Sequence, residues 1–390
     1  MILEALFIVA LALVAYPYLV YPLLLYALTR NRDGPAPPPP AVELPPVTVI
    51  TSVYNEAAVI VDKVKNLLCL KYPTDRVRIV IASDGSQDDT VPLARNASQG
   101  HAHVEIIDFE TRRGKASVLH DLVTRAQTDI VALSDANTFF EPEALERLTR
   151  WFSDPEVGCV CGHMELIPAV EGSRNESMYW TLETRLKQWE NRVGAVLGAN
   201  GGIYAFRRDA YEPIAENTIT DDFVLPMLIR KRGYRIVYDS TAVATEETAP
   251  TISHEFKRRT RIGAGNLQAL SWTRDLLRPS AGWTAFTYWS HKVARWVAPI
   301  LLVSAFLIAL TQMDAPFYRG VAIVGMVLLA VALTGWLLER AGRRVPQGLA
   351  APYAFVALNL ALVAGAVQFI RGKQYARWSR TPRGTESAGP

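Results

Sequence analysis

The sequence predicts an α/β domain with a Rossmann-like, mainly parallel sheet, joined to α-helical transmembrane segments. Short apolar runs alternate with helical stretches between Pro46 and about Asp239, as in a parallel sheet covered on both faces. On either side of this region stand charge-free runs long enough to cross a bilayer core of ~30 Å. The formal net charge is only +3, which argues against nucleic acid as a partner, because phosphate binding needs concentrated Lys and Arg.

The N-terminal apolar run covers residues 5–29 and contains no charged residue. We expect a transmembrane helix over residues 1–30. A cleaved signal peptide fits less well, because no basic segment precedes the run and its apolar part is too long. Arg30 and Arg32 follow the helix, which places the next domain in the cytoplasm by the positive-inside rule. Residues 31–46 are rich in proline and predict a stiff linker.

Three further apolar runs close the chain, and each is about 18 or more residues long. They cover residues 296–313, 320–338 and 348–370. We expect three transmembrane helices within residues 293–370. Between the second and third runs lie three basic residues that mark another cytoplasmic loop: Arg340, Arg343 and Arg344.

The tail, residues 371–390, conflicts with this count. Four spans and a cytoplasmic catalytic domain put the C-terminus outside, yet the tail is basic. Its charges are Arg371, Lys373, Arg377, Arg380 and Arg383. Either one apolar run is interfacial or re-entrant, or the remaining charges outweigh those of the tail.

The three cysteines are Cys69, Cys159 and Cys161, an odd number in a domain expected to face a reducing compartment, so no disulfide framework is predicted. Cys159 and Cys161 lie in an apolar, strand-like run with His163 nearby. A metal site would need a second pair of ligands at suitable spacing, and none is present. Core packing is the favoured interpretation.

Five apolar runs predict strands at residues 47–53, 77–82, 103–107, 130–133 and 157–161, with a helix over 57–70. In such sheets ligands bind at the carboxyl ends of the strands. Three of those ends are polar: Tyr54-Asn55-Glu56, Ser83-Asp84-Gly85-Ser86, and Ser134-Asp135-Ala136-Asn137. Each alone also suits a turn or a helix cap, but three on one edge favour a site.

The usual glycine-rich phosphate loops, Walker A and GxGxxG, are missing from the sequence. Proteins that handle a diphosphate without such a loop commonly use a divalent cation held by carboxylates. Asp135 and Asn137 suit that role, because alternate positions leaving a strand point to the same side and offer oxygen ligands.

The chain resembles the membrane-integrated, polysaccharide-synthase-like branch of the family 2 glycosyltransferases, which are inverting enzymes with a GT-A fold. Six strings carry the resemblance in the family's order: VTVITSVYNEAAVI, ASDGSQDDT, RRGKA, SDAN, GANGGIYAFRR and TDDFVLPMLIRKRGYRIVYD. The GT-A domain is expected over residues 47–250.

The resemblance implies roles for individual residues. Tyr54, Glu56 and Asp84 would hold the nucleoside, and Lys115 would lie near the base or the phosphates. Asp135 would bind Mg²⁺ or Mn²⁺ through the donor diphosphate. Asn137 stands where the family has a second acid, which gives one weaker oxygen ligand. The GANGG string would contact the acceptor through Asn200 and Gly201.

The same resemblance aligns Asp222, with Asp221 beside it, to the family's general base. Inverting transfer needs one carboxylate to take the proton of the acceptor hydroxyl as that hydroxyl attacks the anomeric carbon. The metal and cationic side chains stabilise the charge on the leaving diphosphate. Acids at a helix N-terminus are also favoured by the helix dipole, and both explanations can hold together.

A basic segment follows at residues 257–262. Processive relatives carry Gln-x-x-Arg-Trp there, with Arg facing the diphosphate and Trp stacking on the acceptor sugar. In this chain Arg258 replaces the Gln, Arg261 keeps the Arg, and Ile262 replaces the Trp. Arg258 and Arg261 are therefore expected at the donor, whereas the stacking platform is lost. A basic face on anionic lipid is the competing interpretation. Residues 251–292 as a whole suit interfacial amphipathic helices.

The leading hypothesis is a metal-dependent, inverting hexosyltransferase in the cell (inner) membrane. It would transfer sugar from a nucleotide-diphosphate sugar, expected to be a UDP-sugar, to a saccharide acceptor at the cytoplasmic face, for exopolysaccharide or cell-surface glycan synthesis with coupled export. Four spans are few for a polysaccharide channel, which leaves room for an oligomer or an export partner. One alternative is a polyprenyl-phosphate glycosyltransferase with a lipid-linked acceptor. Another is a catalytically inactive transport or scaffold subunit.

Overall fold

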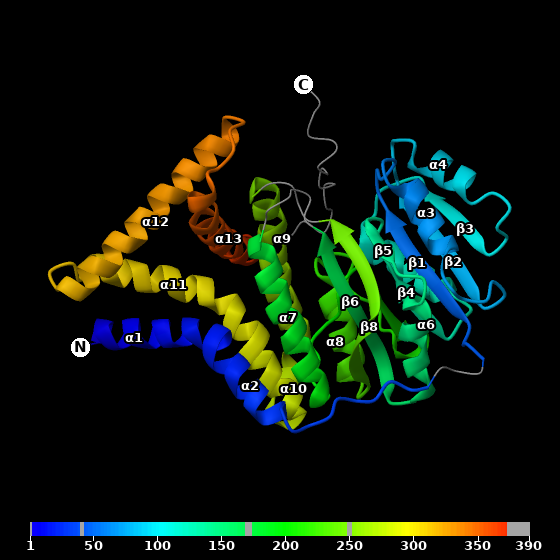
Figure 1. The fold of residues 1–390 in the computed structure, drawn as a ribbon, viewed down its shortest axis with the longest axis horizontal. Coiled ribbons are helices and arrows are strands. Elements are labelled where there is room, and N and C mark those ends of the chain that lie inside the picture. The colour runs from blue at the N-terminus through cyan, green and yellow to red at the C-terminus, as the bar shows by residue number, and fades with distance from the viewer. Residues whose placement is uncertain (1, 40–42, 168–173, 248–251, 373–390) are drawn as a thin grey trace.

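The computed structural model of the chain describes residues 2–39, 43–167, 174–247 and 252–372, without the side chains of 174–179. The α/β domain and the long apolar helices form two parts that lie side by side (Figure 1). The tail from Lys373 onward, for which basic charges were noted, lies outside the described residues.

One eight-stranded sheet, in the order β3-β2-β1-β4-β7-β6-β8-β5, organises the α/β domain. The strands are β1 (Val47–Val53), β2 (Val77–Asp84), β3 (Val104–Phe109), β4 (Ile130–Leu133), β5 (Thr138–Phe140), β6 (Val157–Ile167), β7 (Tyr204–Arg207) and β8 (Arg235–Glu247). The first four are parallel neighbours, as are β6 and β8. β7 is antiparallel to both β4 and β6, and β5 is antiparallel to β8.

The five predicted strands are confirmed, and β5, β7 and β8 are additional. All seven residues of β1 are buried, as expected of a central strand in a sheet covered on both faces. Burying a Val or Ile side chain stabilises the fold by about 1.5–3 kcal/mol, so each strand contributes substantially to the core.

Helices cover both faces of the sheet. α3 (Ile60–Leu68), α4 (Thr90–Ala97) and α6 (Ala144–Thr149) pack on one face. α5 (Lys115–Arg125), α8 (Asp221–Lys231) and part of α9 (Ile252–Thr273) pack on the other. Cys159 and Cys161 are fully buried in that second core, as the sequence predicts.

Within the described residues, four helical stretches are long and apolar enough to cross a membrane, which agrees with the number of apolar runs in the sequence. The first consists of α1 (Ile2–Ala15), the π-helical turn η1 (Tyr16–Val20) and α2 (Tyr21–Thr29). The second runs from α10 (Trp283–Thr287) through the π-helical turn η6 (Tyr288–Val293) into α11 (Ala294–Thr311). The others are α12 (Pro316–Arg340) and α13 (Gln347–Ile370). Phe7 of α1 packs edge-on against Tyr318 of α12, with ring centroids 5.0 Å apart.

The region expected to hold interfacial amphipathic helices is one long helix, α9, followed by the short turns η4 (Arg274–Leu277) and η5 (Pro279–Ala281) and by α10. Its apolar residues Leu270, Trp272 and Leu276 belong to the core of the α/β domain or pack against it. Their apolar surface is therefore covered by protein, and a membrane contact for this region stays a prediction.

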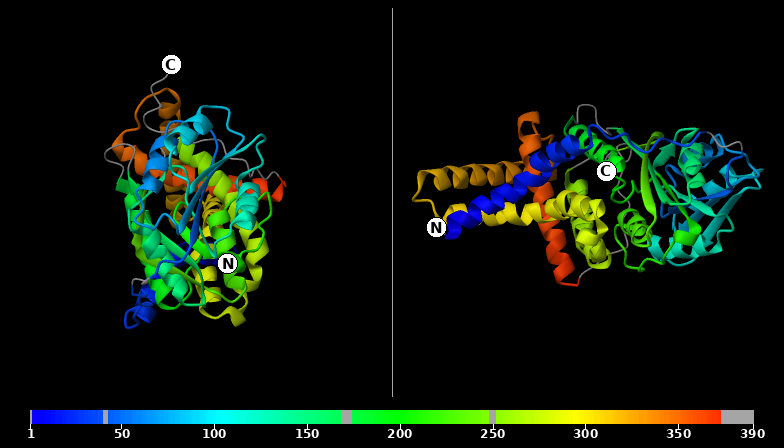
Figure 2. Two further views of the ribbon diagram at one scale, coloured as in Figure 1. Left: turned by 90° about the vertical axis from the view of Figure 1, so that its right-hand side faces the viewer. Right: turned by 90° about the horizontal axis from the view of Figure 1, so that it is seen from below.

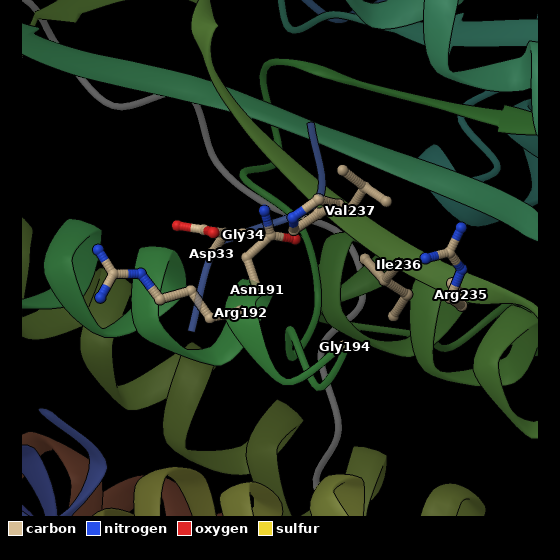
Figure 3. A pocket seen from close by; sticks show the side chains of 9 residues that line it. Asp33, Gly34, Asn191, Arg192, Gly194, Arg235, Ile236 and Val237 are labelled. Atoms are coloured by element: carbon tan, nitrogen blue, oxygen red, sulfur yellow. The ribbon is translucent and has the colours of Figure 1, made fainter. Parts of the chain in front are cut away.

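Two short 3₁₀ turns, η2 (Arg150–Ser153) and η3 (Arg208–Ala210), complete the domain with α7 (Arg174–Arg192). The linker leaves α2 and passes the end of α7. A pocket of about 240 Å³ lies there, between Asp33, Asn191, Arg192 and the first residues of β8 (Figure 3). Asn191 is occupied with the edge of β8, because its side chain both accepts from Tyr238 N (3.1 Å) and donates to Tyr238 O (3.0 Å). This pocket thus marks the seam between linker and sheet.

Candidate active site

The loops that follow β1 and β2 are tied together by side-chain hydrogen bonds. Ser86 Oγ accepts from Asn55 N (3.1 Å), and Asn55 Oδ1 accepts from Gln87 N (2.8 Å). Asn55 adopts a positive φ of 53°, a conformation that Asn tolerates better than most residues. The amide N–H of Glu56 donates to Thr90 Oγ1 (2.7 Å). Tyr54 and Glu56 are thereby fixed at the carboxyl edge of the sheet.

Asp84 lies beneath the next loop. It is fully buried, and its two carboxylate oxygens accept the backbone N–H groups of Arg113 (2.7 Å) and Gly114 (2.8 Å). This loop carries Arg112, whose guanidinium lies 3.7 Å from the centre of the Tyr54 ring. Asp84 therefore supports the loop from below, and its expected contact with the nucleoside stays a prediction.

Lys115, at the start of α5, joins the two acidic motifs. Its Nζ lies 2.9 Å from Asp135 Oδ1 and 3.1 Å from Asp221 Oδ2. Burial alone would lower the pKa of Lys115, but the two carboxylates outweigh it and raise that pKa above its usual value. The ammonium is thus permanently charged, and it brings together motifs that are 86 residues apart in the chain, Asp135 and Asp221.

Asp222 follows Asp221 in the first turn of α8, where the helix dipole favours a negative charge. Its side chain faces Gly201, because a Cβ on that glycine would lie 3.1 Å from Asp222 Oδ2. Burial, reinforced by the charge of Asp221, raises the pKa of Asp222 to about 6. A carboxylate with such a pKa is a better proton acceptor near neutral pH than an ordinary aspartate.

Asn137 is held by a residue that the sequence did not single out. Its amide Nδ2 donates to Glu246 Oε1 (3.0 Å), and Thr138 Oγ1 lies 3.4 Å from the other carboxylate oxygen. Glu246 lies near the end of β8, and burial followed by the charge of Asp135 raises the pKa of its carboxyl group. Glu246 therefore orients the Asn137 amide within the metal motif.

The oxygen-bearing side chains beside Asp135 are chemically suited to a hard divalent cation. Four acidic side chains, those of Asp135, Asp221, Asp222 and Glu246, surround this end of the cavity, and Lys115 is paired with two of them. Carboxylate and amide oxygens are the ligands that such cations prefer. Among the described residues, no three His, Cys, Asp or Glu side chains could hold a metal ion by themselves. A cation at Asp135 and Asn137 would accordingly need oxygen ligands from the donor.

A buried lysine supports the metal motif from behind. Lys63 of α3 is fully buried, and its Nζ donates to Ser134 Oγ (2.5 Å) and to the carbonyl oxygen of Thr138 (2.5 Å). It thus connects the two ends of the loop that contains Asp135. Burial lowers the pKa of Lys63 to about 7. In the sequence Lys63 is one polar position in an amphipathic helix, so nothing there distinguished it.

The basic segment lies on α9 at the edge of the cavity. Arg258 donates to Glu255 from Nε (2.6 Å) and Nη2 (3.0 Å), and Arg259 donates to the same carboxylate (2.7 Å). Arg261 reaches back to the carbonyl oxygen of Ile219 (3.4 Å). These contacts fix the segment so that Arg258, Arg261 and Ile262 all line the cavity.

The GANGG loop is closely packed, and its glycines Gly201 and Gly202 have little or no space for a side chain. Asn200 Nδ2 donates to the carbonyl oxygen of Gly162 (2.8 Å). A Cβ at Gly202 would lie 2.1 Å from Thr138 Oγ1, far inside van der Waals contact. The loop thus seats Gly201 directly opposite Asp222.

One cavity of about 540 Å³ collects nearly all the predicted site residues. Those on its wall are Tyr54, Glu56, Lys115, Asp135, Asn137, Asn200, Gly201, Asp221, Asp222, Arg258 and Arg261. Asp84 is the exception, for the reason given above. The structure therefore brings the other predicted site residues together in one cavity, whereas that cavity's use as a site and the individual roles within it stay predictions.

The cavity also reaches the transmembrane helices, where the sequence gave no signal for a site. Its wall there includes Tyr18 of η1, with Glu183 and Lys187 of α7, and Lys292 and Arg295 of the second span. Glu183 is in contact with three neighbours: Lys292 Nζ at 3.2 Å, His291 Nε2 at 3.1 Å, and Arg295. These neighbours hold the pKa of the buried Glu183 carboxyl well below its usual value, although burial opposes the shift.

Behind this cluster, His291 Nδ1 lies 2.6 Å from Glu190 Oε1, which also accepts the Tyr21 hydroxyl (2.9 Å). His291 is fully buried. The sequence alone gave it no special part. Its partners are more than 100 positions away in the chain, and only the fold brings them together.

Comparison with known proteins agrees with this geometry. Residues 48–214 match the model of the family described as glycosyl transferase family 2. This region of the chain is therefore similar to family 2 glycosyltransferase domains. That stretch contains the loops after β1, β2 and β4, together with Lys115 and the GANGG loop.

Two curated relatives are similar to this chain. The poly-β-1,6-N-acetyl-D-glucosamine synthase of Staphylococcus aureus (strain COL) is 28% identical over 234 residues, covering 58% of this chain and 56% of the relative. The synthase of the same name from Staphylococcus epidermidis is 24% identical over 230 residues, covering 57% and 55%. The similarity thus spans only a little over half the length of these curated relatives.

Among solved structures, the mannosyltransferase PcManGT from Pyrobaculum calidifontis, in complex with GDP-Man and Mn²⁺, superposes with a TM-score of 0.74. It is 22% identical, and the superposition covers 95% of this chain and 99% of that one. The predicted fold, a GT-A domain with attached apolar helices, is therefore confirmed for nearly the whole chain.

Proposed function

We propose that the chain transfers a sugar, with inversion, from a nucleoside-diphosphate sugar to a saccharide acceptor at the cytoplasmic face of the cell membrane. The observation that carries the proposal is the convergence of Asp135, Asp221 and Asp222 around Lys115 in one cavity. The similarity to poly-β-1,6-N-acetyl-D-glucosamine synthases supports exopolysaccharide or cell-surface glycan synthesis. The UDP-sugar donor stays an expectation from the sequence.

In the proposed reaction the Asp222 carboxylate takes the proton of the acceptor hydroxyl. The hydroxyl oxygen then forms a bond to the anomeric carbon, while the bond from that carbon to the diphosphate breaks and the diphosphate keeps the electron pair. Lys115, Arg258 and Arg261 lie on the same cavity wall and would stabilise the negative charge of the leaving group. A divalent cation held by Asp135 and Asn137 would neutralise part of that charge.

Tyr54 and Glu56 would contact the nucleoside, since they stand at the carboxyl edge of the sheet where such ligands bind. Asn200 and Gly201 would contact the acceptor, because Gly201 faces Asp222 with no side chain between them. The position of Ile262 on the wall, where processive relatives carry Trp, supports an acceptor that is not held by stacking at this point.

The orientation follows from the charges beside the spans. Arg30 and Arg32 end the first span, and Arg340, Arg343 and Arg344 follow α12. By the positive-inside rule these ends lie in the cytoplasm, together with the α/β domain.

The test is a screen of radiolabelled nucleotide sugars with the purified, detergent-solubilised chain, followed by sizing of the product. Wild-type protein should transfer from one donor, and Asp222→Asn should bind nucleotide but not transfer. Asp129→Asn is a matched control, because Asp129 is 94% exposed and lies outside the cavity. Transfer by Asp222→Asn at the wild-type rate would overturn the assignment of the base.

The cations at the membrane end of the cavity favour one second candidate, a polyprenyl-phosphate acceptor. Lys187, Lys292 and Arg295 share this part of the wall with a single carboxylate, Glu183, which suits an anionic group on a lipid-linked acceptor. A chloroform-soluble monosaccharide lipid as the product would select this function, whereas a water-soluble polymer would select the first. If the wild-type protein transfers no sugar with any donor and acceptor tested, an inactive transport or scaffold subunit is favoured instead.

A further inference from the structure

The last apolar helix, α13, does not run with the others. α1, α11 and α12 extend away from the α/β domain, and the start of α1 and the turn between α11 and α12 lie at the same far end (Figure 1). α13 lies across them, at the level where the spans meet the catalytic domain, as the views from the front and from below both show (Figures 1 and 2). Its composition is that of a span, but its direction is not.

Contacts with α9 fix this direction. A Cβ at Gly365 of α13 would lie 2.2 Å from Thr260 O and 2.8 Å from Ala264 N. A Cβ at Gly263 of α9 would likewise lie 2.9 Å from Leu362 O. The two backbones therefore touch at their glycines, and α13 cannot turn into line with the spans without losing this contact.

The cytoplasmic end of α12 holds the other end of α13. Glu339 accepts from the backbone N–H of Ser253, the second residue of α9 (3.2 Å), and from the Tyr353 hydroxyl (2.6 Å). The Tyr353 ring fills the space beside Gly335, where a Cβ would lie 2.6 Å from Cγ. α9, α12 and α13 thus meet at the Glu339 carboxylate, and from there α13 runs across the direction of α12.

Along the rest of α13, large apolar side chains are exposed, among them Phe355 (50%) and Ile370 (79%). The helix contains no charged residue. α11 and α12 also expose large apolar side chains, among them Leu307 and Val324. Exposed apolar surface of this kind marks a protein or a membrane contact, and the charge-free composition of α13 favours lipid.

Basic residues lie on both sides of α13 in the sequence. Arg340, Arg343 and Arg344 precede it, and Arg371, Lys373, Arg377, Arg380 and Arg383 follow it. If α13 crossed the bilayer, one of these groups would lie outside, against the positive-inside rule. If α13 lies in the membrane surface, both groups lie on the side of Arg30 and Arg32. There each of these charges is attracted to anionic headgroups.

We propose that α13 lies along the cytoplasmic surface of the bilayer, with its exposed apolar side chains in contact with lipid, so that the chain crosses the membrane three times and its tail is cytoplasmic. The fourth apolar run is thus the interfacial one, which removes the conflict between span count and tail charge. Leu362 of α13 lines the catalytic cavity, and α9 carries Arg258 and Arg261. The membrane surface therefore supports the wall of the active site through α13.

Cysteine labelling with a membrane-impermeant maleimide tests the proposal. Cys69 is exposed on the α/β domain and is a native marker for its side, whereas Cys159 and Cys161 are buried. Single-site probes are made in a Cys69→Ser background: Ser379→Cys and Ser387→Cys in the tail, and Asp314→Cys in the turn between α11 and α12. Each variant is labelled in intact cells, in inverted vesicles, and after detergent treatment as a full-labelling reference.

We expect both tail cysteines to react in the preparation in which Cys69 reacts, and Asp314→Cys to react in the opposite one. Labelling of the tail cysteines together with Asp314→Cys would show that α13 crosses the bilayer and would overturn the proposal. The comparison is between sides of one membrane and requires no enzymatic activity, so it remains decisive if the proposed function fails.

Discussion

The role of Asp222 can be tested through the pH dependence of transfer. With a pKa of about 6, about one Asp222 side chain in ten is ionised at pH 5 and nearly all are ionised at pH 8. If the ionised form is the base, kcat/KM should rise about tenfold from pH 5 to a plateau above pH 7. The ordinary aspartate pKa, near 4, would put this rise below pH 5.

Asp222→Asn is the perturbation that isolates this effect. Asn has nearly the same shape as Asp, so the packing against Gly201 is kept. Loss of a general base lowers turnover by about 10²–10⁴-fold, and the acid limb of the profile should vanish with it. The assay is release of nucleoside diphosphate at fixed donor and acceptor across pH 5–8, with Asp129→Asn as the control. A variant that keeps the acid limb, or that keeps wild-type turnover, refutes the reasoning.

Four further predictions follow from named contacts. Because burial raises the pKa of Asp222, the folded protein loses stability as the pH rises from about 4 to 6. Asp222→Asn removes this loss and should raise the free energy of unfolding by about 1–3 kcal/mol at pH 7. A lower melting temperature than that of the wild type would contradict this. Asp135→Ala should abolish the dependence of nucleotide binding on Mg²⁺ or Mn²⁺ in calorimetry, and unchanged dependence would move the metal elsewhere. His291→Ala should destabilise the detergent-solubilised protein by about 1–3 kcal/mol, because Glu183 and Glu190 each lose one buried hydrogen-bond partner. Thermal unfolding within about 1 °C of wild type would be the contrary result. Gly365→Ala should cost about 1–3 kcal/mol by forcing α13 from α9, while Gly348→Ala on the same helix, with open space around it, should cost little; equal effects would argue against the close contact.

The sequence predicted much of the sheet because its parallel strands are continuously apolar and are separated by amphipathic helices. β1 and β4 begin and end at the predicted residues, and the others agree within a few positions at their starts. β7 was missed because its four residues follow a glycine-rich loop, and only their position between β4 and β6 makes them a strand. β8 was missed because its apolar and polar residues follow no single period over 13 residues.

The candidate site was predictable where a motif stands at a strand end or a helix start. Asp135 and Asp222 are of this kind. Lys63 and Glu246 could not be found in this way, because each acts through one long-range contact and is otherwise an ordinary polar residue of a helix or a strand. The membrane-end cluster around Glu183 has the same character. The spacing of residues in the sequence predicts which side chains are neighbours within one helix or strand. The members of this cluster come from different helices, so spacing could not reveal it.

The two π-helical turns have a consequence for how this chain can vary. η1 and η6 each contain one more residue per turn than an α-helix, and they face each other, with Tyr16 and Ser290 joined by a hydrogen bond of 2.8 Å. Deleting one residue from either turn would rotate everything beyond it by about 100°. Tyr21 would then face away from Glu190, or the side chains of α11 would leave α1. A one-residue deletion in either turn would therefore disturb packing between segments that lie some 270 positions apart in the chain.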